Sequence, residues 1–226
     1  MTTLRKLERT ITACTLCPRL VRWRRQAAQN PPRRYSGMEY WARPLAGFGD
    51  PAARCLIIGL APAAHGGNRT GRIFTGDRSG DWLFEALHAH GFANQPTSVH
   101  RRDGLKLQDC YITAAVRCAP PLNKPTREEF ETCRPYLTRE LRLLKRVRVV
   151  VALGGIAFDA FFKAFRENEG EVPRPKPRFH HGACIRLEAG PTLMASYHPS
   201  QQNTFTGKLT REMFDEVFSR ARSLLE

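Results

Sequence analysis

The stretch Val147-Arg-Val-Val-Val-Ala-Leu153 decides the fold class of this chain. It is a nearly continuous run of β-branched and aliphatic residues, which is typical of a strand buried on both faces of a parallel sheet. Gly154-Gly155 follows at once and leads into a segment with apolar residues at helical spacing. A buried strand that turns directly into a helix is the repeating unit of α/β proteins.

The same pattern recurs on both sides of this stretch. Further strands are predicted at 55–58, 111–116, 183–187 and 192–196, and helices at 80–90, 126–144 and 209–225. Thr126 and Glu129 have the spacing of a capping box, which marks a helix start. Strands that alternate with helices predict an open, largely parallel sheet covered on both faces.

Two loops follow predicted strands directly. Gly59-Leu-Ala-Pro62 comes after one strand, and Tyr197-His198-Pro-Ser200 comes after another, far along the chain. Ligands of open α/β sheets bind outside the carboxyl ends of the strands. We therefore expect these two loops to meet over one crevice.

The charge of the chain points to a polyanionic partner. The formal net charge is +15, and residues 1–50 hold ten Lys and Arg against three acidic residues. Basic groups interleaved with aromatic rings suit a surface that follows a nucleic-acid backbone. A solvated basic surface without such a partner is the alternative. The arginines concerned are Arg19, Arg22, Arg24, Arg25, Arg33 and Arg34, with Trp23 and Tyr35 among them.

No apolar run approaches the ~18 residues that a membrane-spanning helix needs, and the N-terminus lacks a signal-peptide pattern. We expect a cytoplasmic protein without a membrane partner, in which thiols stay reduced. The length suits a single domain over 1–226, with 1–52 as a basic N-terminal segment.

Seven cysteines therefore indicate ligands or core residues rather than disulfides. Cys14 and Cys17 form a C-x2-C pair, and Cys118 and Cys133 lie outside the strand interiors. Four such thiols suit either zinc or an iron–sulfur cluster, and a second pair that is not C-x2-C favours the cluster. Ordinary buried thiols at Cys118 and Cys133 are the alternative. The other three cysteines, which are Cys55, Cys110 and Cys184, are expected in the core.

The loop from Gly59 to Asp77 has the composition of a binding loop. Its glycines let the backbone approach a ligand closely, and Phe74 offers a ring on which a flat heterocycle could stack. His65, Asn68, Arg69, Arg72 and Asp77 supply polar groups. A glycine-rich surface loop without a ligand is the alternative.

Two more polar groups follow strands. Asn123 offers the paired donor and acceptor that suit a base edge, although it could simply cap a turn before Pro125. His198 could donate a hydrogen bond to an oxyanion on a leaving group, although lone histidines are more often structural. Gln201, Gln202 and Asn203 could enter a groove.

Together these features resemble the uracil-DNA glycosylase superfamily, and within it the family-five type of bacteria and archaea. The resemblance covers nearly the whole chain and rests on several motifs in one order. They are Cys14-x2-Cys17, Gly59-Leu-Ala-Pro-Ala63, Gly71-Arg-Ile-Phe-Thr-Gly-Asp77, Arg117-Cys118-Ala-Pro-Pro-x-Asn123-Lys-Pro125, Cys133-Arg-Pro135 and His198-Pro-Ser200.

The resemblance implies a three-layer α/β sandwich with a central, mainly parallel four-stranded sheet. It implies a [4Fe-4S] cluster on Cys14, Cys17, Cys118 and Cys133, with Phe74 stacked on an extruded base and His198 supporting charge on the departing base. The segment after His198 would fill the space left in the duplex. We expect base contacts from Gly59, Ala61, Pro62, Ala63, His65 and Phe74, and DNA contacts from Arg69, Arg72, Ser200, Gln201, Gln202 and Asn203.

One departure from the wider superfamily affects catalysis. Sister families place a polar or acidic side chain in the first turn, where this chain has Leu60 and Ala61. A carboxylate that orients water must come from elsewhere, and Asp77 is the candidate, with Asp81 as the fallback and Asn123 shaping the base site. Fewer side-chain contacts to uracil also predict a broader range that includes hypoxanthine or xanthine.

The sequence thus predicts a monomeric, monofunctional glycosylase that acts on uracil-containing DNA in base excision repair. Two other function classes remain. A non-catalytic iron–sulfur or zinc DNA-binding module would use the same loops only to hold DNA. An iron–sulfur electron carrier is disfavoured, because a carrier needs neither a charge of +15 nor a His-Pro-Ser loop.

Overall fold

The computed structural model describes residues 3–226, and a six-stranded sheet forms its centre in the order β1-β3-β2-β4-β6-β5. The inner strands β3, β2, β4 and β6 are mutually parallel, whereas the edge strands β1 and β5 are antiparallel to their neighbours. The strands are β1 (Phe48–Gly49), β2 (Cys55–Gly59), β3 (Cys110–Ala114), β4 (Val149–Leu153), β5 (Cys184–Arg186) and β6 (Thr192–Ser196).

The predicted, mainly parallel sheet is confirmed, but the count of four strands holds only for its parallel part. The strand predicted at 183–187 is β5, and it adds one antiparallel edge. The opposite edge, β1, is two residues long, with Phe48 paired to Ile112. Alternation cannot mark so short a strand, so the sequence pattern of 29–52 indicated only an irregular segment.

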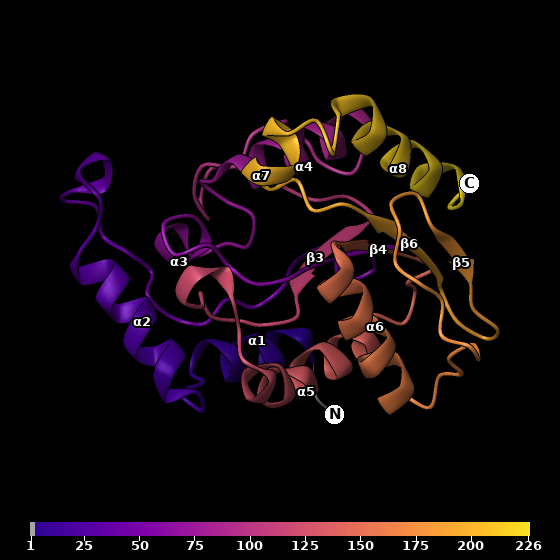
Figure 1. Ribbon diagram of the computed structural model, residues 1–226, viewed down its shortest axis with the longest axis horizontal. Helices are drawn as coiled ribbons and strands as arrows, with labels where there is room; N and C mark the ends of the chain where they lie inside the picture. The colour runs from indigo at the N-terminus through magenta and orange to yellow at the C-terminus, as the bar shows by residue number, and fades with distance from the viewer. Residues whose placement is uncertain (1–2) are drawn as a thin grey trace.

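Helices cover both faces of the sheet, which makes the predicted three-layer sandwich (Figure 1). Helices α4 and α8 lie on one face, and α1, α5 and α6 lie on the other (Figure 1). The α-helices are α1 (Leu4–Thr12), α2 (Pro18–Gln29), α3 (Gly67–Thr70), α4 (Arg78–Ala89), α5 (Arg127–Leu143), α6 (Gly155–Glu167), α7 (Gln201–Phe205) and α8 (Arg211–Ser223), and the 3-10 helices are η1 (Arg33–Tyr35) and η2 (Pro121–Asn123).

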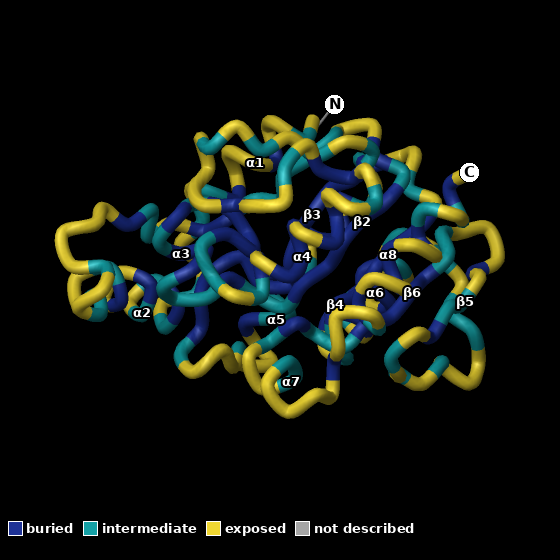
Figure 2. The backbone as a smooth tube through the Cα atoms, turned by 90° about the horizontal axis from the view of Figure 1, so that it is seen from above, coloured by how far each residue is buried: buried dark blue, intermediate teal, exposed yellow. Residues whose placement is uncertain are grey.

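The parallel strands are apolar on both faces, and alternate residues enter two separate cores. Ile57 and Val151 pack with Phe84 and Phe218 on the α4–α8 side. Ile58 and the other strand residues whose side chains point to the opposite face pack on the α5–α6 side. All five residues of β2, β3 and β4 are buried, and Figure 2 shows the buried backbone along the strands. Burial on both faces explains why these strands read as continuous apolar runs.

The helix that carries one of the predicted ligand cysteines begins as the sequence indicates. The Thr126 side chain accepts a hydrogen bond from the Glu129 backbone N–H, and the Glu129 carboxylate accepts one from Thr126 N–H, so the capping box is confirmed. The helix then continues through Pro135 to Leu143.

The N-terminal helices do not add to the sheet. Helix α1 packs on α5 through Leu7 and Ile11, which contact Tyr136. Helix α2 lies at one end of the molecule beside α3 (Figure 1). Among residues 3–226, no helix combines the length and apolarity that a membrane crossing requires.

Candidate functional site

The carboxyl ends of β2, β4 and β6 lie side by side, and the predicted loops meet there. The loop that carries Phe74 follows β2, and His198 follows β6. Gly154 ends the intervening strand β4, and a Cβ atom at Gly154 would lie 3.5 Å from His198 Cβ. The expected convergence of two distant loops over one edge of the sheet is therefore found.

The rings of Phe74 and His198 face one another. Their centroids lie 5.8 Å apart with 28° between the ring planes. Phe74 also lies against Gly59, where any Cβ atom would come within 2.7 Å of the ring, so only glycine permits this position. Phe74 has a φ of +55°, a conformation that costs about 1–3 kcal/mol and is characteristic of functional sites.

Asp77 lies next to this ring pair along the same loop. It caps α4, because its Oδ1 accepts a hydrogen bond from Gly80 N–H at 3.0 Å. A Cβ atom at Gly66 would collide with Asp77 Oδ2, so the carboxyl group lies against the backbone of Gly66 in the loop after β2. Burial is the main cause that raises the pKa of Asp77 above its usual range. The fallback, Asp81, is exposed.

Burial also sets the protonation state of His198. It lowers the pKa of the imidazole to about 4, so His198 is neutral at pH 7 and carries one N–H donor. A hydrogen bond within the following helix and loop holds its backbone in place, because Asn203 Nδ2 donates to the His198 carbonyl oxygen at 2.8 Å. We call Gly59, Phe74, Asp77 and His198 the ring site.

The turn after β2 is fixed by backbone hydrogen bonds rather than by side chains. The N–H groups of Ala115 and Val116, just past β3, donate to the carbonyl oxygens of Gly59 and Leu60 at 2.9 Å each. The following residues Ala61, Pro62 and Ala63 continue the turn, and Pro62 is buried. The turn thus presents main-chain groups and small side chains, as the sequence predicted.

His65 and Arg69 brace this loop. His65 Nδ1 lies 2.9 Å from the Tyr40 hydroxyl, and burial, followed by the charges of Arg34 and Arg69, lowers the pKa of His65. Arg69 donates from Nε to the His65 carbonyl oxygen at 2.8 Å and from Nη2 to the Gly76 carbonyl oxygen at 3.1 Å. Arg69 therefore ties together both ends of the segment that carries Phe74.

The structure contradicts the prediction that Arg72 contacts DNA. Its side chain is buried, and Nη2 donates to Asp103 Oδ2 and to Ser98 Oγ at 2.6 Å each. Nε donates to Thr75 Oγ1 at 3.0 Å. A buried guanidinium paired with a carboxylate has no donor to offer a phosphate, so Arg72 holds the loop in place.

The loop after His198 divides into anchors and exposed side chains. Ser200 caps α7 by accepting from Asn203 N–H at 3.3 Å, and the Asn203 amide holds His198, so both are engaged within the loop. Gln201 and Gln202 are exposed, where a groove could receive them. Of the four side chains in this segment for which the sequence predicts DNA contacts, the two glutamines are thus the exposed ones.

Asn123 does not join the ring site through any contact within residues 3–226. It is exposed at the end of η2, with a φ of +56°. Its backbone N–H donates to the Pro120 carbonyl oxygen, as in a tight turn. A role at a base edge would require this exposed side chain to swing toward the ring site when DNA binds.

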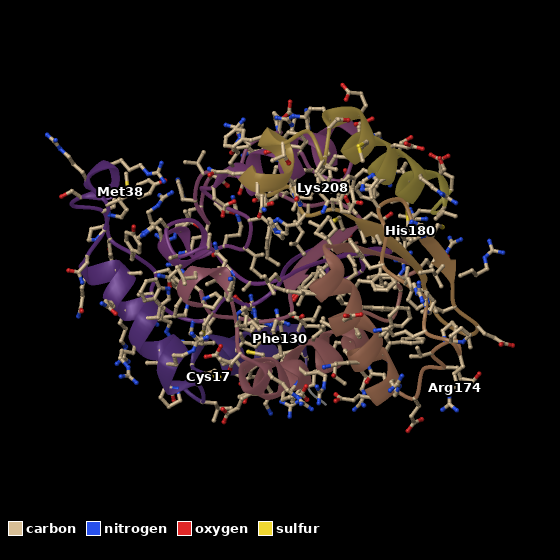
Figure 3. All side chains as sticks on the ribbon, in the orientation of Figure 1. Cys17, Met38, Phe130, Arg174, His180 and Lys208 are labelled. Carbon is tan, nitrogen blue, oxygen red and sulfur yellow. The ribbon has the colours of Figure 1, made fainter. Side chains whose placement is uncertain are left out.

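The four predicted ligand cysteines gather between α2, α5 and the segment after β3. Cys17 packs with Cys118, Cys133 and Phe130, and Figure 3 shows Cys17 and Phe130 at the same side of the molecule. The Cys14 thiol is close enough to raise the pKa of each of the other three. All four thiols therefore surround one place, although they come from three separate segments.

Burial raises the pKa of three of these thiols, those of Cys17, Cys118 and Cys133. Burial, then the neighbouring Cys133 and Glu129, raises the pKa of Cys17 to about 11. Burial likewise raises the pKa of Cys118 to about 12, against the nearby charge of Arg24. In the described part of the chain, no three His, Cys, Asp or Glu side chains converge closely enough for a single metal ion.

Sequence reasoning missed the role of Arg24. Its side chain is 3% exposed, and Nη1 donates to Cys118 Sγ at 2.9 Å. Within residues 3–226 it forms no ion pair with a carboxylate, and its Nε lacks a partner. The spacing of Cys17 and Arg24 could have indicated this role. The two residues are seven positions apart, about two turns of a helix, so Arg24 lies on the same helix face as Cys17.

A family model described as the uracil DNA glycosylase superfamily matches residues 46–222, which include the whole ring site. The chain belongs to this superfamily. Relatives named Type-5 uracil-DNA glycosylase share about half of its residues. The protein of Thermus thermophilus is 53% identical over 215 residues, which cover 95% of this chain and 95% of that protein. The protein of Mycobacterium tuberculosis is 50% identical over 220 residues, 97% of this chain and 81% of its own.

Membership in the superfamily confirms the resemblance that the motifs indicated. A more distant relative, named Type-4 uracil-DNA glycosylase, comes from Pyrobaculum aerophilum and is 30% identical over 198 residues, which cover 87% of this chain and 83% of that protein. The higher identity to the Type-5 proteins agrees with the family-five motifs of this chain.

Proposed function

We propose that this protein removes uracil from DNA by hydrolysing the N-glycosidic bond. The observation that carries the proposal is the ring site, in which Phe74 and His198 face one another at 5.8 Å beside a carboxyl group. The Type-5 relatives, which carry the name of uracil-DNA glycosylases over nearly the whole chain, support the same reaction.

The target base must first leave the duplex. Extrusion of a nucleotide costs a few kcal/mol and is easier for a mispaired base, which favours uracil opposite guanine. Phe74 then offers its face to the extruded ring, while the main-chain groups of the turn 59–63 approach the base edge. The strained φ of Phe74 holds the ring in place before the base arrives.

His198 acts on the departing base as a neutral donor. As the bond between the base nitrogen and the sugar C1′ breaks, uracil takes the bonding electrons and negative charge grows on its carbonyl oxygens. A neutral imidazole with a pKa of about 4 stabilises that charge by donating one hydrogen bond, without giving up its proton. One such donor contributes about 10²–10³ in rate.

Asp77 acts on the sugar side. Its Oδ1 is fixed by Gly80 N–H, and its Oδ2 remains beside Gly66 to orient water. The raised pKa makes the carboxylate a stronger base than an exposed one. Water adds to C1′ and its proton passes to Asp77. Asp77 then releases this proton to solvent and the uracil anion takes one up, so the products are free uracil and an abasic site.

This scheme has no covalent lysine intermediate, so we expect the sugar–phosphate strand to stay intact. The apolar first turn contributes Leu60 and Ala61 and leaves recognition of the base to backbone groups and one ring. We therefore propose that hypoxanthine and xanthine are also released, although more slowly than uracil.

A base-release assay tests the proposal. The protein is incubated with duplexes that carry uracil, hypoxanthine or xanthine, and each sample is divided before alkali is added. Release of uracil gives cleavage only after alkali, at the uracil position. Nicking without alkali would contradict the monofunctional scheme, and the absence of any alkali-labile site would leave only a DNA-binding module.

We further propose that Cys14, Cys17, Cys118 and Cys133 hold a [4Fe-4S] cluster. Four thiols around one place match the donor set of such a cluster, which would join three segments of the chain. Arg24 provides a buried positive charge for four deprotonated thiolates.

Purified protein tests the cluster directly. We expect brown colour, broad visible absorption, and iron and sulfide in nearly equal amounts. Cys133→Ser should lower the iron content and the yield of folded protein together, whereas Cys184→Ser, at an edge strand, should change neither. Zinc without sulfide in the wild-type protein would contradict the cluster.

A further inference from the structure

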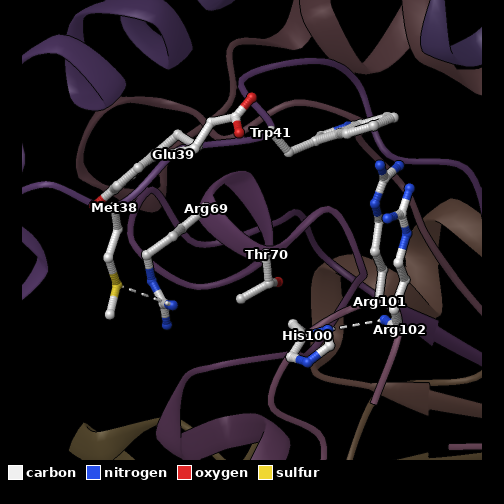
Figure 4. A pocket seen from close by; sticks show the side chains of 9 residues that line it. Met38, Glu39, Trp41, Arg69, Thr70, His100, Arg101 and Arg102 are labelled. Atoms are coloured by element: carbon white, nitrogen blue, oxygen red, sulfur yellow. Dashed lines mark hydrogen bonds between the residues drawn. The ribbon is translucent and has the colours of Figure 1, made fainter. Parts of the chain in front are cut away.

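A cavity of about 500 Å³ lies beside the ring site and carries several positive charges (Figure 4). Its mouth is open to solvent, and among its described lining residues Glu39 is the one carboxylate. We call it the cationic pocket and define it by Trp41, Arg69, Thr70, His100, Arg101 and Arg102.

The cations of this pocket are held in position but not neutralised. The Arg101 guanidinium lies 4.3 Å from the centre of the Trp41 ring, and the Arg69 guanidinium lies 4.2 Å from that of Tyr35. Figure 4 shows Arg101 and Arg102 extending side by side toward Trp41. Stacking on Trp41 fixes the Arg101 guanidinium and leaves its donors free, which favours bidentate binding of an oxyanion, whereas Arg69 uses Nε and Nη2 within its own loop.

The neighbouring Arg72 shows what a purely structural arginine looks like in this chain. Arg72 is 7% exposed and is neutralised by Asp103 at 2.6 Å. Arg101 and Arg102, from the same loop as Asp103, are exposed, and within residues 3–226 neither forms an ion pair. The loop therefore neutralises one arginine and leaves the other two available.

The pocket lies close along the chain to Phe74, on which the extruded base is proposed to stack. Its floor includes Thr70, and Gly71 packs beside it, because a Cβ atom there would meet Arg101 at 3.1 Å and Trp41 at 3.3 Å. Gly71 precedes Phe74 by three residues, which span at most about 10 Å of extended chain. That span equals about three nucleotides at ~3.4 Å per nucleotide along one strand.

We propose that the cationic pocket binds a phosphodiester of the DNA strand that carries the target base, within about three nucleotides of that base. The predicted position of the phosphodiester rests on the proposed function, whereas the prediction that the ligand is an anion rests on the charges of the pocket itself. Arg69 connects the two sites, because it lines the pocket and also holds both ends of the segment that carries Phe74.

The salt dependence of DNA binding tests the ligand. The probe is a duplex with one 2′-fluoro-deoxyuridine, which resists hydrolysis, and affinity is measured over a range of salt concentrations. Arg101→Gln/Arg102→Gln should weaken binding about tenfold and lower the slope of log affinity against log salt by about 1–2, since each neutralised phosphate contributes ~0.9. The matched control, Arg146→Gln/Arg148→Gln, removes two exposed arginines just before β4, at the opposite end of the strands, and should leave the slope unchanged.

Neutral linkages locate the phosphate. Methylphosphonates replace single phosphates along either strand of the same duplex. We expect the wild-type protein to lose affinity at a linkage within about three nucleotides of the uracil, on the same strand, and the Arg101→Gln/Arg102→Gln protein to be insensitive to that replacement.

Three results would overturn the inference: an unchanged salt slope in Arg101→Gln/Arg102→Gln, an equal fall in the slope of both double variants, or the same methylphosphonate profile in wild-type and variant protein. Binding and base release are separate readouts. If the pocket does not bind a phosphate, wild-type protein still releases uracil, while the salt slope of the Arg101→Gln/Arg102→Gln protein stays at the wild-type value. If the protein is not a uracil-DNA glycosylase, no uracil is released, while the salt slope of the Arg101→Gln/Arg102→Gln protein still falls.

Discussion

The ring site and the cationic pocket share one segment, the loop after β2 that carries Arg69 and Phe74, yet the charges of their side chains are opposite in kind. In the ring site, burial keeps His198 neutral and raises the pKa of Asp77. In the cationic pocket, Arg101 and Arg102 are exposed and fully charged. Chemistry on a base needs desolvated groups, whose hydrogen bonds are stronger, whereas binding of a polyanion needs hydrated cations that displace counterions.

The difference teaches that net charge alone does not locate a DNA-binding surface. Two arginines, Arg72 and Arg24, are buried and donate hydrogen bonds to protein groups. Only cations that remain exposed can add to the electrostatic attraction of DNA. The comparison predicts that substitutions in the ring site mainly lower the rate of uracil release, and that substitutions in the cationic pocket mainly lower the affinity for DNA.

The largest expected effect comes from Asp77. Asp77→Asn keeps the shape of the side chain and an oxygen that can cap α4, but it removes the base, so the single-turnover rate of uracil release should fall about 10²–10⁴-fold with DNA affinity kept. Asp81→Asn, four residues on and exposed, is the matched control and should stay near wild type. A loss in Asp81→Asn instead would transfer the role to that residue.

His198→Ala should have the next largest effect. The loss of one hydrogen-bond donor to the departing base should slow release about 10²–10³-fold, again measured in a single turnover. His180→Ala, on an exposed histidine, serves as the control. If DNA affinity fell while the bound complex reacted at the normal rate, His198 would belong with the cationic pocket and the comparison would fail.

Arg24 sharpens the comparison, because it is a buried charge that has no carboxylate partner within residues 3–226. Arg24→Gln should remove charge from beside the Cys118 thiol, so the proposed cluster should bleach several-fold faster under air while the protein stays folded. Arg25→Gln, on the next and exposed residue of α2, should bleach at the wild-type rate. Equal bleaching in both variants would show that Arg24 does not act on the cluster.

The pH dependence should give the smallest effect. Because the pKa of His198 is about 4, the rate should show no inflection near pH 6.5, where an exposed histidine titrates. Below about pH 6.5 the unfolded chain takes up a proton that folded His198 does not, so the free energy of unfolding should fall as the pH drops toward 4. Rate profiles and denaturant unfolding check the two statements, and an inflection near 6.5 that is lost in His198→Ala would contradict the first.

The parallel strands and the ring site could be predicted from the sequence because both are local. Each strand is a continuous apolar run, and Phe74 and His198 lie in loops directly after strands, so the rule for open sheets brings them together. The motifs then gave each side chain its expected role. The capping box at Thr126 followed from spacing in the same way.

What the sequence did not reveal depends on distant partners. Arg72 is buried because Ser98 and Asp103, 26 and 31 residues away, lie in an irregular loop. The edge strand β1 exists only because β3 pairs with it. The cationic pocket combines two such loops around Trp41 and Arg101, and neither loop carries a motif.

A double-mutant cycle on Phe74 and His198 tests most directly whether the two rings act on one extruded base. Single-turnover rates of uracil release are measured for the wild type, Phe74→Ala, His198→Ala and the double variant. We expect the double variant to lose much less than the product of the two single losses, because a base that no longer stacks on Phe74 is also misplaced for His198. Losses that simply multiply would contradict a shared site.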